Sequence, residues 1–321
     1  MRRKLAVLAV APVLLAACGG DSEEAAGGGG GGSEGATAVT VGVIPILDVA
    51  PIYVGQEQGF FEDCGIDLTL ETAQGGAAIV PGVVSGDYQF GFSNVTSLLL
   101  AASEGLPLKV VANGVTSTGE QEADFGAVVT LPDNGIADAA GLEGKSVAVN
   151  TLNNIGTTTI RASVREAGGD PDSVEFVELP FPDMAAALEG GDVDAIWVVE
   201  PFLTAATANG AQFVASNFVD AAPDLTVATY FTSEQYAGEN ADVVECFTSA
   251  MEESLQYSQD NPDAVREALT GYTEIDPGLV EQLTLPQFPT EINRDSIQTL
   301  SDLAVEDGLV DEAPDLDQLL P

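Results

Sequence analysis

From Val39 onward, short β-branched or aromatic runs alternate with helical stretches, and this alternation constrains the fold more than any other feature. Consecutive strands joined by helical crossovers run parallel, and a parallel sheet needs helices on both faces. The sequence therefore predicts an α/β fold with parallel or mixed sheets. The expected strands are 39–44, 66–71, 88–92, 108–112, 125–130, 146–149, 174–178, 195–199 and 228–231. The expected helices are 52–61, 76–85, 94–104, 157–167, 184–188, 242–259, 262–269, 277–285 and 294–307.

The alternation restarts near Ser146, and the two series share a turn. In the first series a helix ends at Gly86-Asp87 before a strand, and in the second a helix ends at Gly191-Asp192 before a strand. Glycine ends a helix readily and aspartate favours the following turn. A length of 321 residues also suits two domains better than one. We therefore expect two related lobes.

The N-terminus has the pattern of an export signal. Arg2, Arg3 and Lys4 precede the mostly apolar segment 5–17, which is too short to span a bilayer as a helix. The segment ends in Leu-Ala-Ala before Cys18, which resembles the lipobox of bacterial lipoproteins. That resemblance implies a signal peptide at 1–17, lipidation of Cys18, and a protein anchored on the outer face of the cytoplasmic membrane. The alternative is an ordinary signal peptide with a chance cysteine.

Glycine dominates the segment that follows the expected cleavage site. Residues 18–38 contain a run of six glycines, and such a composition predicts a flexible tether rather than a folded element. Two further cysteines, Cys64 and Cys246, form an even pair in a chain expected outside the cell. Such a pair usually closes a disulfide. The alternative is two buried free thiols.

Charge and composition exclude several functions. The chain has 9 Lys and Arg against 51 Asp and Glu, and this acidic balance disfavours nucleic-acid binding. It contains no histidine, which removes His-dependent nucleophilic catalysis, His general bases and His metal sites. Carboxylate-only or Ser-Lys chemistry stays open on composition alone. We expect no catalytic residues, no metal and no cofactor.

The order of several segments resembles the extracytoplasmic solute-binding proteins of ABC importers. Within them the chain is most similar to the group that binds aliphatic sulfonates (SsuA-like), nitrate and thiamine precursors (NMT1/THI5-like). The resemblance runs from about residue 39 to the end, and its motifs are weak singly. They are VGVIP at 41–45, APIY at 50–53, QGFF at 58–61, GDYQFG at 86–91, LEGKSVAV at 142–149, VDA at 193–195 and EPF at 200–202, with a closing helix at 303–308 before PDLD at 314–317.

This resemblance implies a type II periplasmic-binding-protein fold whose lobes close on solute about a two-strand hinge. Lobe 1 would comprise 39–127 and 227–321, and lobe 2 would comprise 128–226. The implied partners are a small-molecule solute, an ABC permease and its ATPase. The protein would be a monomer that touches the membrane only through its lipid anchor, and it would not be an enzyme.

Candidate ligand contacts follow from the position of loops. Ligands of open α/β sheets sit beyond the carboxyl ends of strands and at helix N-termini. The residues expected there are Asp48, Pro51, Gln74, Gly75, Ser93, Asn94, Asn153, Asn154, Gly156, Thr157, Trp197 and Glu200.

Several of these residues have a structural alternative. Ser93, Asn94 and Asp48 would also serve as helix caps, Trp197 as a core residue, and Glu200 as a structural residue before Pro201.

No Lys or Arg falls in these loops, so an anion would depend on backbone N–H groups and helix dipoles. Asp48 and Glu200 instead favour a cationic amine or a donor-bearing heterocycle such as a pyrimidine, with sulfonate or nitrate as the competing ligands. Two other functions stay open. One is a surface receptor lipoprotein that does not transport, and the other is an enzyme related to thiamine-precursor biosynthesis.

Overall fold

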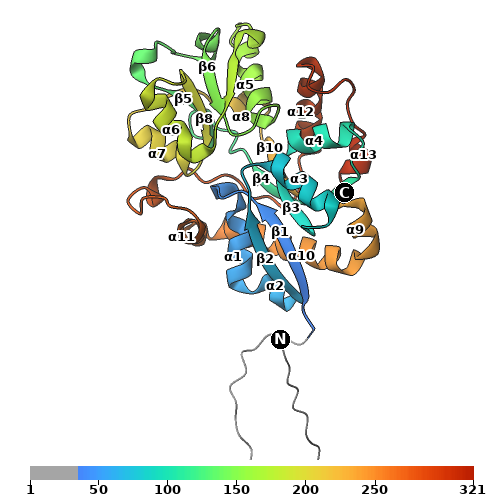
Figure 1. The fold of residues 1–321 in the computed structure, drawn as a ribbon. Helices are drawn as coiled ribbons and strands as arrows, with labels where there is room; N and C mark the ends of the chain where they lie inside the picture. The colour runs from blue at the N-terminus through green and yellow to red at the C-terminus, as the bar shows by residue number, and fades with distance from the viewer. Residues whose placement is uncertain (1–34) are drawn as a thin grey trace, which may run out of the picture. The chain divides into compact units, whose positions relative to one another are not determined.

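The structure is a computed structural model that describes residues 35–321. Two five-stranded sheets form its framework, and they define lobe 1 and lobe 2 (Figure 1). The sheet of lobe 1 contains β1 Thr37–Val43, β2 Ile66–Thr72, β3 Phe90–Asn94, β4 Leu108–Thr116 and β10 Thr226–Ser233. The sheet of lobe 2 contains β5 Gly126–Thr130, β6 Ser146–Val149, β7 Glu175–Glu178, β8 Ala195–Val199 and β9 Gln212–Ala215.

Helices cover both sheets. Those of the first part of the chain are α1 Ala50–Gln58, α2 Phe60–Asp63, α3 Gly76–Ser85 and α4 Val95–Ser103. Those between the strands of lobe 2, and just after them, are α5 Ile155–Glu166, α6 Phe181–Gly190, α7 Phe202–Ala208 and α8 Asn217–Ala221. After β10 follow α9 Glu234–Glu239, α10 Ala241–Asp260, α11 Pro262–Tyr272, α12 Arg294–Glu306 and α13 Leu316–Leu319.

The two sheets have the same topology. Their strand orders are β2-β1-β3-β10-β4 and β7-β6-β8-β5-β9, and in each the fourth strand runs antiparallel to both neighbours. Each antiparallel strand is the first one after the chain crosses between lobes, through segments 117–125 and 216–225. The expected α/β fold with two lobes and mixed sheets is therefore confirmed.

The shared turn occupies the same place in both lobes. Gly86 ends α3 with φ 84° before β3, and Gly191 ends α6 with φ 73° before β8. Only glycine adopts this left-handed conformation without strain. Since β3 and β8 are the third strands of equivalent sheets, the sequence repeat marks a structural repeat.

The prediction of a helix over 277–285 is wrong. The structure has turns and a short 3-10 helix at Val280–Gln282, and the chain then runs extended. Prolines at 286 and 289 prevent a regular helix from continuing. The extended segment is instead tied to β4, because the backbones of Gln287 and Thr116 exchange two hydrogen bonds of 3.0 and 2.9 Å.

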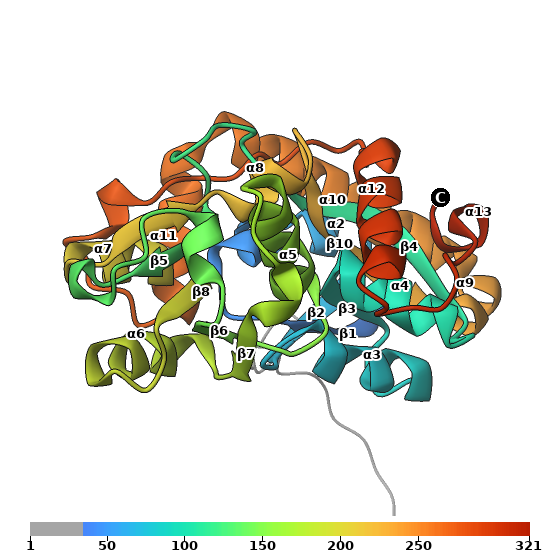
Figure 2. The same cartoon turned by 90° about the horizontal axis from the view of Figure 1, so that it is seen from above.

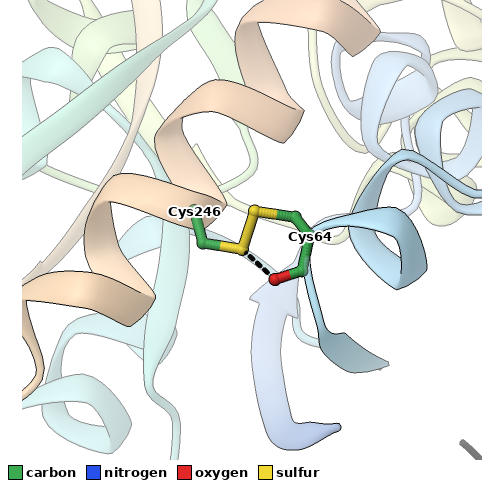
Figure 3. The surroundings of a disulfide bond; sticks show 2 residues. All are labelled: Cys64 and Cys246. Atoms are coloured by element: carbon green, nitrogen blue, oxygen red, sulfur yellow. Dashed lines mark hydrogen bonds between the residues drawn. A yellow bond between two sulfur atoms is a disulfide. The ribbon is translucent and has the colours of Figure 1, made fainter.

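A disulfide lies within lobe 1. It joins Cys64, just after α2, to Cys246 in α10, with Cα atoms 5.7 Å apart (Figure 3). The bridge connects parts of the chain 182 positions apart, so it fastens the N-terminal βα unit to the C-terminal helices.

The export signal, Cys18 and most of the expected tether lie outside the described residues. The last two residues assigned to the tether, 37 and 38, belong to β1. Within residues 35–321, no helix combines the length and the apolar character that a membrane crossing needs.

Candidate functional site

A small cavity lies where the two lobes meet, and we call it the inner cavity. Its volume is about 30 Å³, which is room for about two water molecules. Its walls come from the ends of β1, β3, β6 and β8 and from the start of β10, so both lobes contribute. The lining residues are Ile44, Ile46, Asp48, Phe92, Asn94, Asn150, Asn154, Ile155, Phe181, Trp197, Val199, Phe218, Val227 and Ala228.

A second cavity of about 310 Å³, the outer cavity, adjoins it. The two share Ile44, Ile46 and Phe181. The outer cavity is mostly apolar, and the residues that line it are Ile44, Pro45, Ile46, Thr72, Ala73, Gln74, Pro180, Phe181, Pro182 and Phe202. None of the described residues that line either cavity is Lys or Arg.

Asp48 is the charged side chain of the inner cavity. It lies within the short 3-10 helix Leu47–Val49, is 3% exposed, and its Oδ1 atom has no hydrogen-bond partner. The following helix α1 has no side-chain cap, so the capping alternative for Asp48 does not hold. Burial and, to a smaller extent, charge repulsion from Asp124 together raise the pKa of Asp48 to about 7. This carboxyl group is therefore poised to meet a donor or a cation from a ligand.

Trp197 is both a core residue and a cavity residue. Its ring is 3% exposed and packs edge-on against Phe218, with centroids 5.9 Å apart. Its Nε1 atom is buried without an acceptor. Gly156 permits this position, because a Cβ atom there would lie 2.6 Å from the indole ring. The cavity thus offers one unpaired acceptor, Asp48 Oδ1, and one unpaired donor, Trp197 Nε1.

Three amide side chains complete the polar lining. Asn94 caps α4 by accepting from Ser97 N at 2.9 Å, and it also faces the cavity. Asn154 caps α5 through Gly156 N and donates to Asn150 Oδ1 at 3.1 Å. Capping and cavity lining therefore coincide at Asn94 and Asn154.

Asn150 also bridges the two lobes. Its Nδ2 atom donates to the backbone oxygen of Gln74 at 3.4 Å. At the neighbouring Gly75, a Cβ atom would lie 2.6 Å from Thr151 Oγ1. The loop after β2 and the loop after β6 are therefore in close contact, which corresponds to closed lobes.

Other expected contacts lie away from the inner cavity. Ser93 is buried and donates to the backbone oxygen of Asn94, and Pro51 is buried in the first turn of α1. Asn153 and Thr157 line a different cavity of about 230 Å³, between α5 and the end of α12. Thr157 also completes the capping box of α5.

Glu200 has a structural environment. Its carboxylate accepts from Thr204 N, Thr204 Oγ1 and Thr284 N at 3.0, 2.7 and 3.1 Å. It is buried and lines neither cavity, and burial raises the pKa of its carboxyl group. Glu200 therefore joins α7 of lobe 2 to the loop before Gln287.

Sequence reasoning missed much of the lining. Asn150 directly follows the strand 146–149, so the rule of carboxyl ends could have found it. The aromatic residues Phe92, Phe181 and Phe218 carry no such signal, since a cavity-facing ring and a core ring look alike in a sequence.

Comparisons with known proteins identify the family and the fold of this chain. The family described as NMT1/THI5 like matches residues 47–265. The taurine-binding periplasmic protein of Escherichia coli is 27% identical over 71% of this chain and 69% of its own length. The formylaminopyrimidine-binding protein of Halalkalibacterium halodurans is 23% identical over 72% and 69%. The periplasmic nitrate-binding protein of Synechocystis superposes with a TM-score of 0.76 at 14% identity, over 89% of this chain and 86% of that one. The type II periplasmic-binding-protein fold is confirmed, and these relatives are binding proteins rather than enzymes.

Proposed function

Because the chain belongs to the NMT1/THI5-like family of ABC-importer substrate-binding proteins, we propose that its inner cavity holds the nitrogen-bearing head of a small solute for delivery to a membrane permease and its ATPase. The lobes expected from the sequence, 39–127 with 227–321 and 128–226, would shift at their limits by one or two residues, because β5 of lobe 2 begins at Gly126 and β10 of lobe 1 begins at Thr226. They would part about the segments 117–125 and 216–225 to admit the solute, since residues of both lobes line the inner cavity.

The observation that carries this proposal is the unpartnered Oδ1 atom of Asp48, in a cavity whose described lining contains no Lys or Arg. A buried polar group without a partner costs about 1–3 kcal/mol, and a buried charge costs more. An amine or an aminopyrimidine edge would supply the missing donor to Asp48. Its ring nitrogen would accept from Trp197 Nε1, and its faces would lie among Phe92, Phe181 and Phe218.

A sulfonate or nitrate is the competing ligand. The donor of Trp197 and the N-termini of α4 and α5 support it, and helix N-termini attract anions. The carboxylate of Asp48 opposes it, because like charges repel unless that group is protonated. The two ligand classes therefore respond to pH in opposite directions.

The test is a thermal-shift screen of amines, aminopyrimidines, taurine, alkylsulfonates and nitrate at pH 5.5 and pH 8, followed by calorimetry. A ligand that binds only the folded state raises its melting temperature. We expect a cationic or donor-bearing ligand whose affinity rises with pH and falls at least tenfold in Asp48→Asn. Asp133→Asn, at an exposed carboxylate of lobe 2, is the control. Tighter binding of nitrate or sulfonates, unharmed by Asp48→Asn, would replace this ligand class by the anionic one.

Lipidation of Cys18 would anchor a monomer on the outer face of the cytoplasmic membrane, and Cys18→Ala should release it into the soluble fraction. A surface receptor without transport would bind the same solute but would not restore its uptake in cells that lack this protein. Product formed from a bound solute would instead favour an enzyme.

A further inference from the structure

The outer cavity has no role if the solute is as small as taurine or nitrate. Its volume of about 310 Å³ is far larger than the 30 Å³ of the inner cavity and reaches the range of small-molecule sites. Only Thr72 and Gln74 bring polar side chains to it. An apolar hollow of this kind, open next to a polar binding cavity, is suited to an apolar group.

Aromatic rings connect the two cavities. Phe181 lies in the wall of both, tilted against Trp197 of the inner cavity with centroids 5.7 Å apart. It also stacks on Phe202 of the outer cavity, with centroids 5.6 Å apart and planes 14° apart. If the head of a ligand is bound at Asp48, a substituent attached to that head would therefore extend along the aromatic rings from Trp197 to Phe202.

The stretch after β1 follows the same course. Ile44 and Ile46 line both cavities, Pro45 lines only the outer one, and Asp48 lines only the inner one. The segment 44–48 thus contributes apolar side chains to the outer cavity and a carboxylate to the inner cavity. This polarity matches a ligand with a charged or donor-bearing end and an apolar end.

We propose that the outer cavity is a subsite for an apolar substituent, so that the solute is an amphiphilic nitrogen compound rather than a compact ion. This inference rests on the proposed function, because the head must first bind beside Asp48. Gln74 and Phe202 then act on specificity, and Phe181 contacts both parts of the ligand.

A series of primary n-alkylamines from ethyl to octyl tests the subsite by calorimetry. Each buried methylene contributes about 0.8 kcal/mol, which is about a fourfold gain in affinity. We expect affinity to rise by about that factor per methylene until the outer cavity is filled, and then to level off. Binding of ethylamine should fall in Asp48→Asn.

Two variants separate the subsite from the head site. Thr72 is exposed and lines only the outer cavity, so Thr72→Phe should fill it and flatten the dependence on chain length while ethylamine binds as before. Phe202→Ser should reduce the dependence by removing the stacked ring. Thr270→Phe, at an exposed threonine of α11, is the matched control and should keep the full dependence.

The outcomes are distinguishable. Amines that bind through Asp48 with equal affinity at every chain length would overturn the subsite and leave the head site standing. A chain-length dependence that Thr72→Phe does not change would also overturn it. Failure of every amine to bind the unaltered protein would overturn the head site and the subsite together.

Discussion

Arg165 of α5 donates from Nη2 to Asp307 Oδ1 at 2.5 Å, and this ion pair joins lobe 2 to the end of α12. The guanidinium also lies 3.1 Å from Glu306 through Nε. Helix α12 is fixed to lobe 1 at its start, because Ser296 Oγ accepts from Thr226 N of β10 at 3.0 Å. In both views of the fold α5 and α12 are neighbours (Figures 1 and 2). The pair therefore forms an electrostatic contact that exists only when the lobes are close at this edge.

We expect Arg165→Gln to shift the lobes toward open forms. The variant leaves Asp307 buried without its cation, and the loss of this contact weakens the closed state only. Apparent ligand affinity falls in proportion to the fraction of closed molecules, so a several-fold loss is expected. Small-angle scattering should show a larger radius of gyration without ligand and an unchanged one with saturating ligand.

Lys145→Gln is the control for this experiment. Lys145 also belongs to lobe 2 but pairs with Asp194 of its own lobe, at 3.6 Å. Its loss should change neither the radius of gyration nor the affinity. Equal behaviour of Arg165→Gln and Lys145→Gln would show that the pair between Arg165 and Asp307 has no part in closure.

The carboxyl group of Asp48 should lower the free energy of unfolding as the pH rises. Its pKa is about 7 in the folded protein against 3.8 as the ordinary value, so between these values the folded state holds a proton that the unfolded state has lost. Folding stability therefore decreases from about pH 4 to pH 7, by at most about 4 kcal/mol for this group. Asp124, Tyr230 and Tyr272 interact electrostatically with Asp48, and both tyrosines stay neutral throughout, since their pKa values are raised.

Chemical denaturation of the wild type and of Asp48→Asn at pH 5 and pH 8 measures this effect. The asparagine variant should be close to the wild type at pH 5 and more stable than it at pH 8. Asp133→Asn should follow the wild type at both values. A constant difference between Asp48→Asn and the wild type at the two pH values would contradict a proton on Asp48.

Much of the fold follows from local sequence patterns. The strands 146–149 and 195–199 and the helix 76–85 have the predicted limits, because apolar runs and glycine stops are local signals. The chain between 202 and 221 folds into α7, β9 and α8, which the sequence did not reveal. Each of these elements is short, and its stability comes from packing on the sheet rather than from its own periodicity.

The location of the site could be predicted from the sequence, but the residues that line it could be predicted only in part. Asp48, Asn94, Asn154 and Trp197 line the inner cavity because strand ends place polar residues there. Glu200 occupies an equivalent position, yet hydrogen bonds from Thr204 and the loop at 284 engage its carboxylate. Whether a side chain at a strand end faces a ligand or a neighbouring loop depends on tertiary contacts that local patterns do not encode.

Reduction of the disulfide between Cys64 and Cys246 should destabilise lobe 1. The bridge closes a loop of 182 positions, and cross-links over long loops contribute about 2–5 kcal/mol by limiting the unfolded chain. We expect a reductant to lower the melting temperature of the wild type. Cys64→Ser/Cys246→Ser should melt at the reduced value with or without reductant. A wild type that melts at one temperature in both conditions would argue against a stabilising bridge.

Trp197 is the sole tryptophan of the chain, so its fluorescence reports on the inner cavity alone. A ligand that accepts from Nε1 and contacts the indole face should shift or quench the emission, and the change should saturate with the calorimetric dissociation constant. Gly156→Ala tests the packing of this ring, because the new methyl group would lie 2.6 Å from it and must displace it. The variant should lose affinity and show an altered emission before ligand is added. Gly238→Ala, on α9 with open space around its Cβ position, is the control and should keep both. An emission that ligand leaves unchanged would place the bound solute away from Trp197.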